Sequence, residues 1–207
     1  DRALFVDETA ARVSGDHVLY ALARDLHARG ELAGDTVVAT VMSNIGFERA
    51  LEREGIALVR TAVGDRNVLE AMLRGGYALG GEQSGHVIDF RYNTTGDGPR
   101  TAMTLLGILA ESGVTLHELT RGVKIAPQIL VNVSSDNGDV LTLASVRDEI
   151  LAAENALGAS GRLLIRPSGT EPLIRVMAEG EDRALIERVA GSVATRIEQE
   201  VRRLASP

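Results

Sequence analysis

The sequence predicts an α/β protein: a mixed sheet domain with helices on both faces, followed by a small α+β domain at the C-terminal end. Up to about residue 125, short apolar segments of strand length alternate with amphipathic segments of helix length. After Pro127 the order changes to a strand, a helix, a hairpin and a long helix. The chain has 207 residues, 44% of them hydrophobic, so it exceeds one typical domain and each part can bury a core.

The first part opens with a short strand, and its clearest helical pattern spans residues 17–29. The apolar residues of that helix recur on one face: Val18, Leu19, Leu22 and Leu26. Asp16 is placed to cap it, Asp65 to cap a helix that runs to residue 74, and Asp97 precedes a helix that runs to residue 111. The remaining elements expected here are strands over 4–6, 37–42, 57–61, 77–79 and 87–89, a turn over 30–35 and a helix over 46–54.

The second part begins between residues 122 and 127. It is expected to contain a strand over 129–133, a turn over 134–139, a helix over 144–157, and hairpin strands over 163–165 and 173–177. A last helix spans residues 183–204. Its apolar stripe indicates core packing and consists of Ile186, Val189, Val193, Ile197 and Val201.

The hairpin carries the most informative motif of the chain, RPSGTEPLIRV, at residues 166–176. Its prolines stiffen the turn, its glycine lets a ligand approach the backbone, and its arginines can bind phosphate oxygens bidentately. The candidate phosphate ligands are Arg166, Ser168, Gly169, Thr170 and Arg175. The alternative on spacing alone is an ordinary tight hairpin with surface arginines.

A second motif, GGEQSGH, occupies residues 80–86 between a helix-like segment and an apolar pair. The glycines permit a tight loop, and a carboxylate, an amide and a hydroxyl suit a ligand that is rich in hydroxyl groups. The residues that can project from this loop are Glu82, Gln83, Ser84 and His86. A Gly-rich loop is weak evidence by itself, and a polar turn with a solvated acid is the alternative.

Together the two motifs resemble the phosphohexomutase superfamily, and within it the phosphoglucosamine mutase family. Further segments resemble that family in the same order: TVMSNIGF at 40–47, VGDRNVLEAML at 63–73, TTGDG at 94–98 and PQILVNV at 127–133. The resemblance covers nearly the whole chain. A GEQSGH loop followed by an RPSGTEPLIRVM run is a highly specific pair.

The resemblance also implies that parts of the enzyme are missing. Family members have four domains and more than twice this length, with a phosphorylated serine in the first domain and a DGDxDR metal loop in the second. Asp1 and Arg2 resemble the last residues of that loop, and no candidate for the phosphoserine loop is present. The implied domains are 1–12 as the tail of domain two, 13–125 as the sugar-binding domain three, and 126–207 as the phosphate-binding domain four.

The resemblance further implies the reaction and the role of each residue. A phosphoserine would pass its phosphoryl group to glucosamine 6-phosphate. The resulting bisphosphate would reorient and return its other phosphoryl group to the serine, with Mg²⁺ as cofactor. Glu82 and Ser84 would read sugar hydroxyls, and Gln83 points to glucosamine as the sugar. His86 would share a proton near the transferring group.

Three further residues are implied by shorter matches. Asp1 would be one of three aspartate ligands of the metal, and Arg2 would lie beside the phosphoserine. Arg66 resembles an active-site arginine, although Asn67 stands where the family often has tyrosine. The histidines outside the motifs are interpreted as surface or helix residues: His17, His27 and His117. Lys124 is interpreted as a solvated lysine.

Composition limits the partners of the chain. A formal net charge of −7 argues against nucleic acid and anionic membrane as partners. The chain has no cysteine, no long apolar run and no signal peptide, which favours a cytoplasmic protein. The expected partners are a phosphosugar substrate and the missing N-terminal domains of the same enzyme.

Other functions remain open on the sequence. The chain could be a half-enzyme that is active only when joined to the missing domains, or a stand-alone module that binds phosphosugars without catalysis. A mutase for another hexose phosphate is a further alternative. A nucleotide-binding domain is disfavoured because the chain has no G-x-x-x-x-G-K-[ST] loop.

Overall fold

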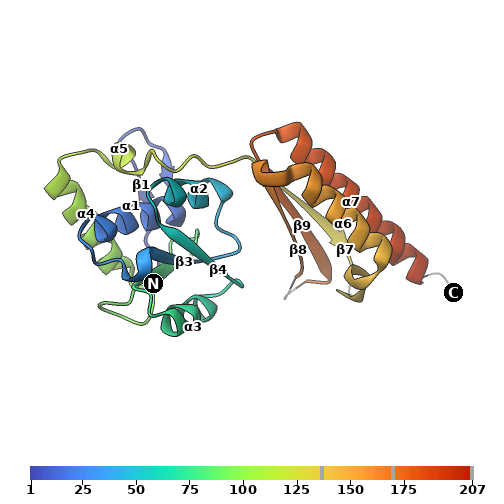
Figure 1. The fold of residues 1–207 in the computed structure, drawn as a ribbon, viewed down its shortest axis with the longest axis horizontal. Coiled ribbons are helices and arrows are strands. Elements are labelled where there is room, and N and C mark those ends of the chain that lie inside the picture. Colours follow the sequence, from blue (N-terminus) through green and yellow to red (C-terminus); the bar gives the residue numbers. More distant parts are fainter. Residues whose placement is uncertain (136–137, 169–170, 206–207) are drawn as a thin grey trace. The chain divides into compact units, whose positions relative to one another are not determined.

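A computed structural model describes residues 1–135, 138–168 and 171–205 of the chain. The chain divides into two compact units, Asp1–Ile125 and Ala126–Pro207 (Figure 1). Each unit has its own sheet and its own buried core. The predicted α/β class is confirmed, with a mixed sheet between helices in the first unit and a smaller sheet against helices in the second.

A four-stranded sheet in the order β4-β3-β5-β6 forms the centre of the first unit. Strands β3 (Thr36–Thr40), β4 (Ala57–Thr61) and β5 (Leu79–Gly81) are parallel, and β6 (Val87–Asp89) pairs antiparallel with β5. Parallel neighbours need crossover connections, which here contain helices. The antiparallel pair β5–β6 needs only a short loop, and that loop carries the GEQSGH motif.

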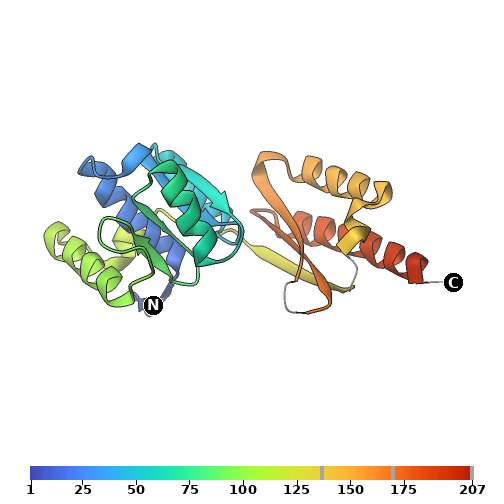
Figure 2. The ribbon, with the colours of Figure 1, turned by 90° about the horizontal axis from the view of Figure 1, so that it is seen from below.

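Helices cover both faces of this sheet (Figure 2), and β3, β5 and β6 are buried, whereas the edge strand β4 is partly exposed. Val37 and Ala39 of β3 belong to the larger core, whereas Val38 between them belongs to a smaller core with Met72 and Ile88. The helices of the unit are α1 (Gly15–Ala28), α2 (Ile45–Arg53), α3 (Asp65–Gly75), α4 (Gly98–Ser112) and α5 (Leu116–Thr120). Helix α3 packs on the side of the smaller core, and the other helices contribute to the larger one.

A short antiparallel pair, β1 (Phe5–Val6) and β2 (Arg12–Val13), precedes α1. The buried carboxylate of Asp7 closes the turn between them, because it accepts hydrogen bonds from the Thr9 hydroxyl at 2.6 Å and from the Ala11 N–H at 2.9 Å. The imidazole of His117 in α5 lies 3.2 Å from the same carboxylate. Asp7 therefore joins the N-terminal turn to α5.

The second unit is an antiparallel sheet in the order β7-β9-β8, made of β7 (Gln128–Ser134), β8 (Gly161–Pro167) and β9 (Leu173–Gly180). Helices α6 (Ala144–Leu157) and α7 (Arg183–Ala205) pack on one face of it (Figure 2). The predicted stripe of α7 is core packing: Ile186, Val189, Val193 and Ile197 are buried, and Val201 packs against them. Single 3-10 turns lie at Ala33–Asp35, Gly138–Thr142 and Gly158–Ser160.

The structure corrects two predicted helix caps. Ser14, not Asp16, is the N-cap of α1, and the Asp16 carboxylate instead accepts a hydrogen bond from the Asn44 backbone N–H at 2.9 Å. Gly64, not Asp65, is the N-cap of α3, and Asp65 is its first helical residue. In both places the tertiary neighbours, rather than the local preference of aspartate for capping, decide where the side chain goes.

Other differences are smaller. Strand β5 covers Leu79–Gly81 and so begins two positions later than the predicted strand. Its two glycines pair with β3, which the sequence did not indicate because glycine is a poor strand former. Helix α5 was not predicted, although Thr115 and Glu118 form a capping box around its first turn. Asp97 precedes α4 as predicted and is its N-cap, and His17, His27 and His117 all lie in helices.

Within the part of the chain that the structure describes, no helix is both long enough and apolar enough to cross a membrane.

The Asp7 contacts generate a prediction about stability at acid pH. Hydrogen bonds from the Thr9 hydroxyl, the Ala11 N–H and His117 lower the pKa of Asp7 from 3.8 to about 2. Because the folded-state pKa is depressed, the stabilisation is complete above the unfolded value and is lost as pH falls from about 4 to about 2. Asp7→Asn should therefore melt below the wild type at pH 5, and the two melting temperatures should converge near pH 2.

Asp148→Asn, at an exposed position in α6, corrects for the loss of one negative charge. A gap between wild type and Asp7→Asn that stays the same size from pH 5 to pH 2 would contradict the assignment.

Candidate functional site

The GEQSGH loop lies at the carboxyl end of β5, where parallel α/β sheets place their ligand-binding loops. The loop is closed by its own backbone: the Glu82 N–H donates to the His86 carbonyl at 2.8 Å, and the Gly85 N–H donates to the Glu82 carbonyl at 3.0 Å. Gly85 has a φ of +94°, a conformation that favours glycine. The sequence thus folds locally into a tight turn that holds its polar side chains in a defined order.

Neighbouring backbone packs against this loop at distances that exclude side chains. The Gly15 N–H donates to the Gln83 carbonyl at 2.9 Å, and a Cβ atom on Gly15 would lie 2.1 Å from the Glu82 carbonyl oxygen. On another side the Ala3 N–H donates to the Gly85 carbonyl at 3.0 Å. The start of α1 and the N-terminal segment therefore fix the loop backbone.

The structure brings Glu82 and Ser84 together. The half-buried Glu82 carboxylate accepts hydrogen bonds from the Gly64 N–H at 3.1 Å and from the Ser84 hydroxyl at 3.4 Å. Gly64 is the N-cap of α3, so the carboxylate lies at the positive end of that helix. Gln83 between them is exposed.

His86 is the most enclosed member of the loop, with 6% of its side chain exposed. Its Nε2 atom accepts a hydrogen bond from the Gly96 N–H at 3.1 Å. The carboxylate of Asp1 lies 3.7 Å from Nδ1, and that of Asp65 lies 3.7 Å from Nε2. The backbone of Arg2 forms an isolated bridge with that of His86, which places Asp1 and Arg2 beside the loop.

Asp65 thus lies beside His86, a place that was not predicted because Asp65 was interpreted as a helix cap. Arg66, which follows it, contacts Asp65 through its backbone, because the Arg66 N–H donates to the Asp65 carboxylate at 2.8 Å. Its side chain is 86% exposed, and its guanidinium pairs with Glu70 one turn along α3 at 2.9 Å.

The described residues do not by themselves form a magnesium site. Among the described residues, no three His, Asp or Glu side chains gather closely enough to hold a metal. Asp1 brings a single carboxylate that is 68% exposed, whereas Mg²⁺ demands near-octahedral oxygen ligation.

The predicted phosphate motif lies where β8 and β9 form a hairpin. Arg166 of β8 is directly opposite Arg175 of β9, which puts both side chains on the same face with Cβ atoms about 5 Å apart. The Ser168 N–H donates to the Leu173 carbonyl at 2.8 Å and closes the ladder. Gly169 and Thr170 lie outside the described residues, so their predicted roles stay predictions.

The positive charge of this pair of arginines is only partly compensated by neighbouring acids. Like charges directly opposite each other on a sheet are destabilising. Arg175 is partly compensated by Glu171, which accepts from a terminal guanidinium nitrogen at 2.7 Å, but its Nε atom is buried and has no hydrogen-bond partner among the described residues. A buried, unpaired donor beside a second arginine is an environment that a phosphate would complete.

Asn132 of β7 lies beside this pair of arginines, because it is directly opposite Arg175 on the other side of β9. The three neighbouring residues Arg166, Arg175 and Asn132 form what we call the arginine row. Ile129, Val131 and Val133 of β7 pack in the core, so the exposed Asn132 lies on the arginine face. Asn132 was not predicted, because the register of β7 against β9 is not visible in the sequence.

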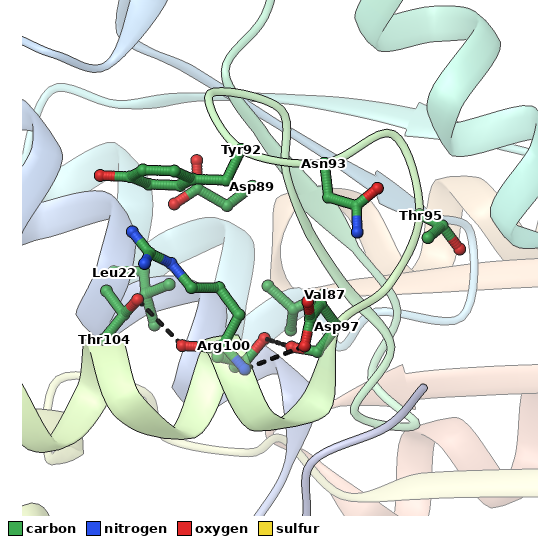
Figure 3. A pocket seen from close by; sticks show the side chains of 10 residues that line it. Leu22, Val87, Asp89, Tyr92, Asn93, Thr95, Asp97, Arg100 and Thr104 are labelled. Carbon is green, nitrogen blue, oxygen red and sulfur yellow. Dashed lines mark hydrogen bonds between the residues drawn. The ribbon is translucent and has the colours of Figure 1, made fainter.

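The described hollows of the first unit do not contain these residues. Figure 3 shows the hollow between β6 and the start of α4. There the Cζ atom of Arg100 lies 3.5 Å from the centre of the Tyr92 ring, and Asp97 accepts a hydrogen bond from the Arg100 N–H at 2.9 Å. Two larger hollows of about 450 and 470 Å³ border α1. The chain therefore has two candidate sites, one in each unit, and each is identified by the chemistry of its side chains rather than by a hollow.

Comparisons with known proteins agree with both halves of the chain. Residues 14–124 match the family described as phosphoglucomutase/phosphomannomutase, alpha/beta/alpha domain III, and residues 130–196 match its C-terminal domain. The phosphoglucosamine mutase of Streptomyces avermitilis is 52% identical over 198 residues, which are 95% of this chain and 44% of that protein. That of Solibacter usitatus is 52% identical over 97% of this chain and 45% of its own length.

Solved structures support the fold. The Aspergillus fumigatus N-acetylphosphoglucosamine mutase, in complex with GlcNAc-6P and magnesium, matches with a TM-score of 0.75 at 21% identity, over 94% of this chain and 49% of that one. An N-acetylglucosamine-phosphate mutase in its substrate complex matches with a TM-score of 0.73 at 18% identity, over 93% of this chain and 45% of that one. The chain thus spans less than half the length of the curated relatives it matches.

The arginine row generates a prediction about anion affinity. Arg166→Met and Arg175→Met should each weaken binding of inorganic phosphate about ten- to a hundredfold, because each removes a charge-assisted contact of roughly 1.5–3 kcal/mol. Calorimetric titration of the chain measures this. Arg188→Met, at an exposed position in α7, controls for net charge and should bind like the wild type. Unchanged affinity in both test variants, with folding intact, would show that the two arginines do not bind phosphate.

Proposed function

Because the chain belongs to the phosphoglucomutase/phosphomannomutase family, we propose that it supplies the sugar-binding loop and the phosphate-binding row of a phosphoglucosamine mutase. The observation that carries this proposal is the opposed pair Arg166 and Arg175 with its buried, unpaired Nε donor. Such a pair suits a fixed phosphate group, and curated relatives of about 50% identity are phosphoglucosamine mutases.

The proposed reaction interconverts glucosamine 6-phosphate and glucosamine 1-phosphate through a phosphoserine and a bisphosphorylated sugar. Phosphoryl transfer of this kind depends mainly on positioning and on stabilisation of charge. The chain spans less than half of its relatives, so the phosphoserine would belong to the remaining part of such an enzyme. In this scheme, the described units hold the sugar while the phosphoryl group moves.

Arg166, Arg175 and Ser168 would bind the phosphate that is not being transferred, together with Gly169 and Thr170. Two guanidinium groups on one sheet face can present parallel N–H donors to phosphate oxygens, a geometry that lysine does not offer. Because β8 and β9 are paired along their length, these donors are set on a rigid element. The phosphate would therefore be bound in the same place in either orientation of the sugar.

Glu82 and Ser84 would read the sugar hydroxyls. The cycle requires the sugar to bind in two orientations related by roughly a half-turn, so the readers must accept either of two adjacent ring hydroxyls. A carboxylate that is already held by the Gly64 N–H and faces the Ser84 hydroxyl can accept hydrogen bonds from both hydroxyls without moving. The exposed Gln83 would contribute to the choice of glucosamine.

His86 would act beside the transferring group, with Arg2 and Asp1 next to it. Arg66 remains a proposed catalytic arginine, and its exposure supports a role towards a ligand more than a role in the fold. Asp1 is the carboxylate of this chain that we propose as a metal ligand, and further ligands would come from outside the described residues.

A chimera tests the proposal. The chain is fused behind the portion of the Streptomyces avermitilis relative that it does not cover, and conversion of glucosamine 6-phosphate is assayed with magnesium and an activating bisphosphate. The chimera should turn over and the chain alone should not. Glu82→Ala in the chimera should lower kcat/KM about ten- to a hundredfold, which corresponds to the loss of a charge-assisted hydrogen bond of roughly 1.5–3 kcal/mol.

Glu154→Ala, at an exposed position in α6, is the matched control and should keep the rate of the parent. An inactive but folded chimera that still binds glucosamine 6-phosphate would favour a binding module without catalysis. A chimera that is faster on mannose or glucose phosphates would assign the chain to another hexose.

A further inference from the structure

Gly96 approaches the imidazole of His86 more closely than any other residue type could. The glycine lies between β6 and α4, and its N–H donates to Nε2 at 3.1 Å. A Cβ atom at this position would lie 2.4 Å from Cε1, 2.5 Å from Nε2 and 2.7 Å from Nδ1. Separations under 3.0 Å between a Cβ and another heavy atom are essentially never seen, so the ring and a side chain cannot both occupy this space.

The backbone itself does not require glycine here. Gly96 has no left-handed φ, in contrast to Gly64 and Gly85 nearby. An alanine could adopt such a φ, and the three atoms nearest to its Cβ would all belong to the ring of His86. The demand for glycine at position 96 therefore comes from the histidine.

The hydrogen bond also fixes the tautomer of His86. A ring nitrogen that accepts from an N–H must offer a lone pair, so Nε2 carries no proton in this arrangement. The proton of the neutral imidazole is then on Nδ1. That edge faces Asp1, whose carboxylate lies 3.7 Å away, whereas the Nε2 edge faces Gly96 and the carboxylate of Asp65.

We propose that Gly96 is a positioning residue that locks His86 as a hydrogen-bond donor through Nδ1, with Nε2 engaged by the backbone. This inference rests on the proposed function, because it refines the role of His86 in that reaction. A neutral imidazole held in this way stabilises negative charge on an oxygen placed near Asp1 by donating its Nδ1–H. It does not act as a base through Nε2 while the Gly96 bond lasts.

The tautomer can be measured on the chain without substrate. Long-range proton–nitrogen NMR correlations of the ¹⁵N-labelled chain, recorded at a pH where the ring is neutral, distinguish the two tautomers. The Nδ1–H form of His86 should dominate in the wild type. In Gly96→Ala the ring should turn away, with a shifted signal and the loss of that dominance, while Gly107→Ala, whose new methyl meets open space, should leave it unchanged.

A dominant Nε2–H form in the wild type would overturn the proposal, and so would an unchanged His86 signal in folded Gly96→Ala. If Gly96→Ala does not fold, the wild-type tautomer still decides this point. Because no substrate is present, the outcome is separate from the success or failure of the mutase assay.

Two substitutions of His86 in the chimera supply a readout that a merely structural contact would not move. The amide of asparagine reaches the position of Nδ1, and the amide of glutamine reaches that of Nε2. His86→Asn should therefore retain at least tenfold more kcat than His86→Gln. An equal loss in both, or a more active glutamine variant, would contradict a donor at Nδ1.

Discussion

The candidate site depends on backbone contacts that are too close for side chains. The loop that carries Glu82 and His86 lies between the backbones of Gly15 and Gly96, each of which would clash with it if it carried a Cβ atom. Loops are ordinarily the more mobile parts of a fold. Here the contacts come from the start of α1 and from the segment before α4, so two parts of the unit that are distant in sequence set the position of the loop. Preorganisation of this kind is what positioning catalysis requires.

The arginine row differs from the loop, because its arginines destabilise the free protein locally and a bound phosphate would relieve this. Arg166 and Arg175 repel each other across β8 and β9, and a buried donor of Arg175 is left unpaired among the described residues. A sheet selected for stability alone would pair such positions with acids, as Arg162 and Glu179 are paired on the same two strands at 2.8 Å. The contrast within one pair of strands supports a binding role for the row.

The sequence predicted most strands and helices because their apolar periodicity reflects burial on one or both faces. The motifs also indicated which side chains carry the chemistry. The cap at Asp16 was wrong because this carboxylate accepts from a tertiary neighbour, Asn44, which local preference does not describe, and the cap at Asp65 was one residue late because the helix begins after Gly64. Asn132 was missed for a related reason, since its place beside Arg175 follows from strand register. Gly96 stood in the quoted TTGDG segment, but only the ring packed against it explains why glycine is there.

The central proposal is that Arg166 and Arg175 bind phosphate and that the GEQSGH loop binds sugar hydroxyls. Backbone NMR titrations of the labelled chain with inorganic phosphate and with glucosamine 6-phosphate test this most directly. Phosphate alone should shift the amide signals around Arg166, Ser168 and Arg175, and only the sugar phosphate should also shift those of Gly64 and residues 82–86. Shifts confined to other surfaces, or loop signals that respond equally to phosphate alone, would contradict the account.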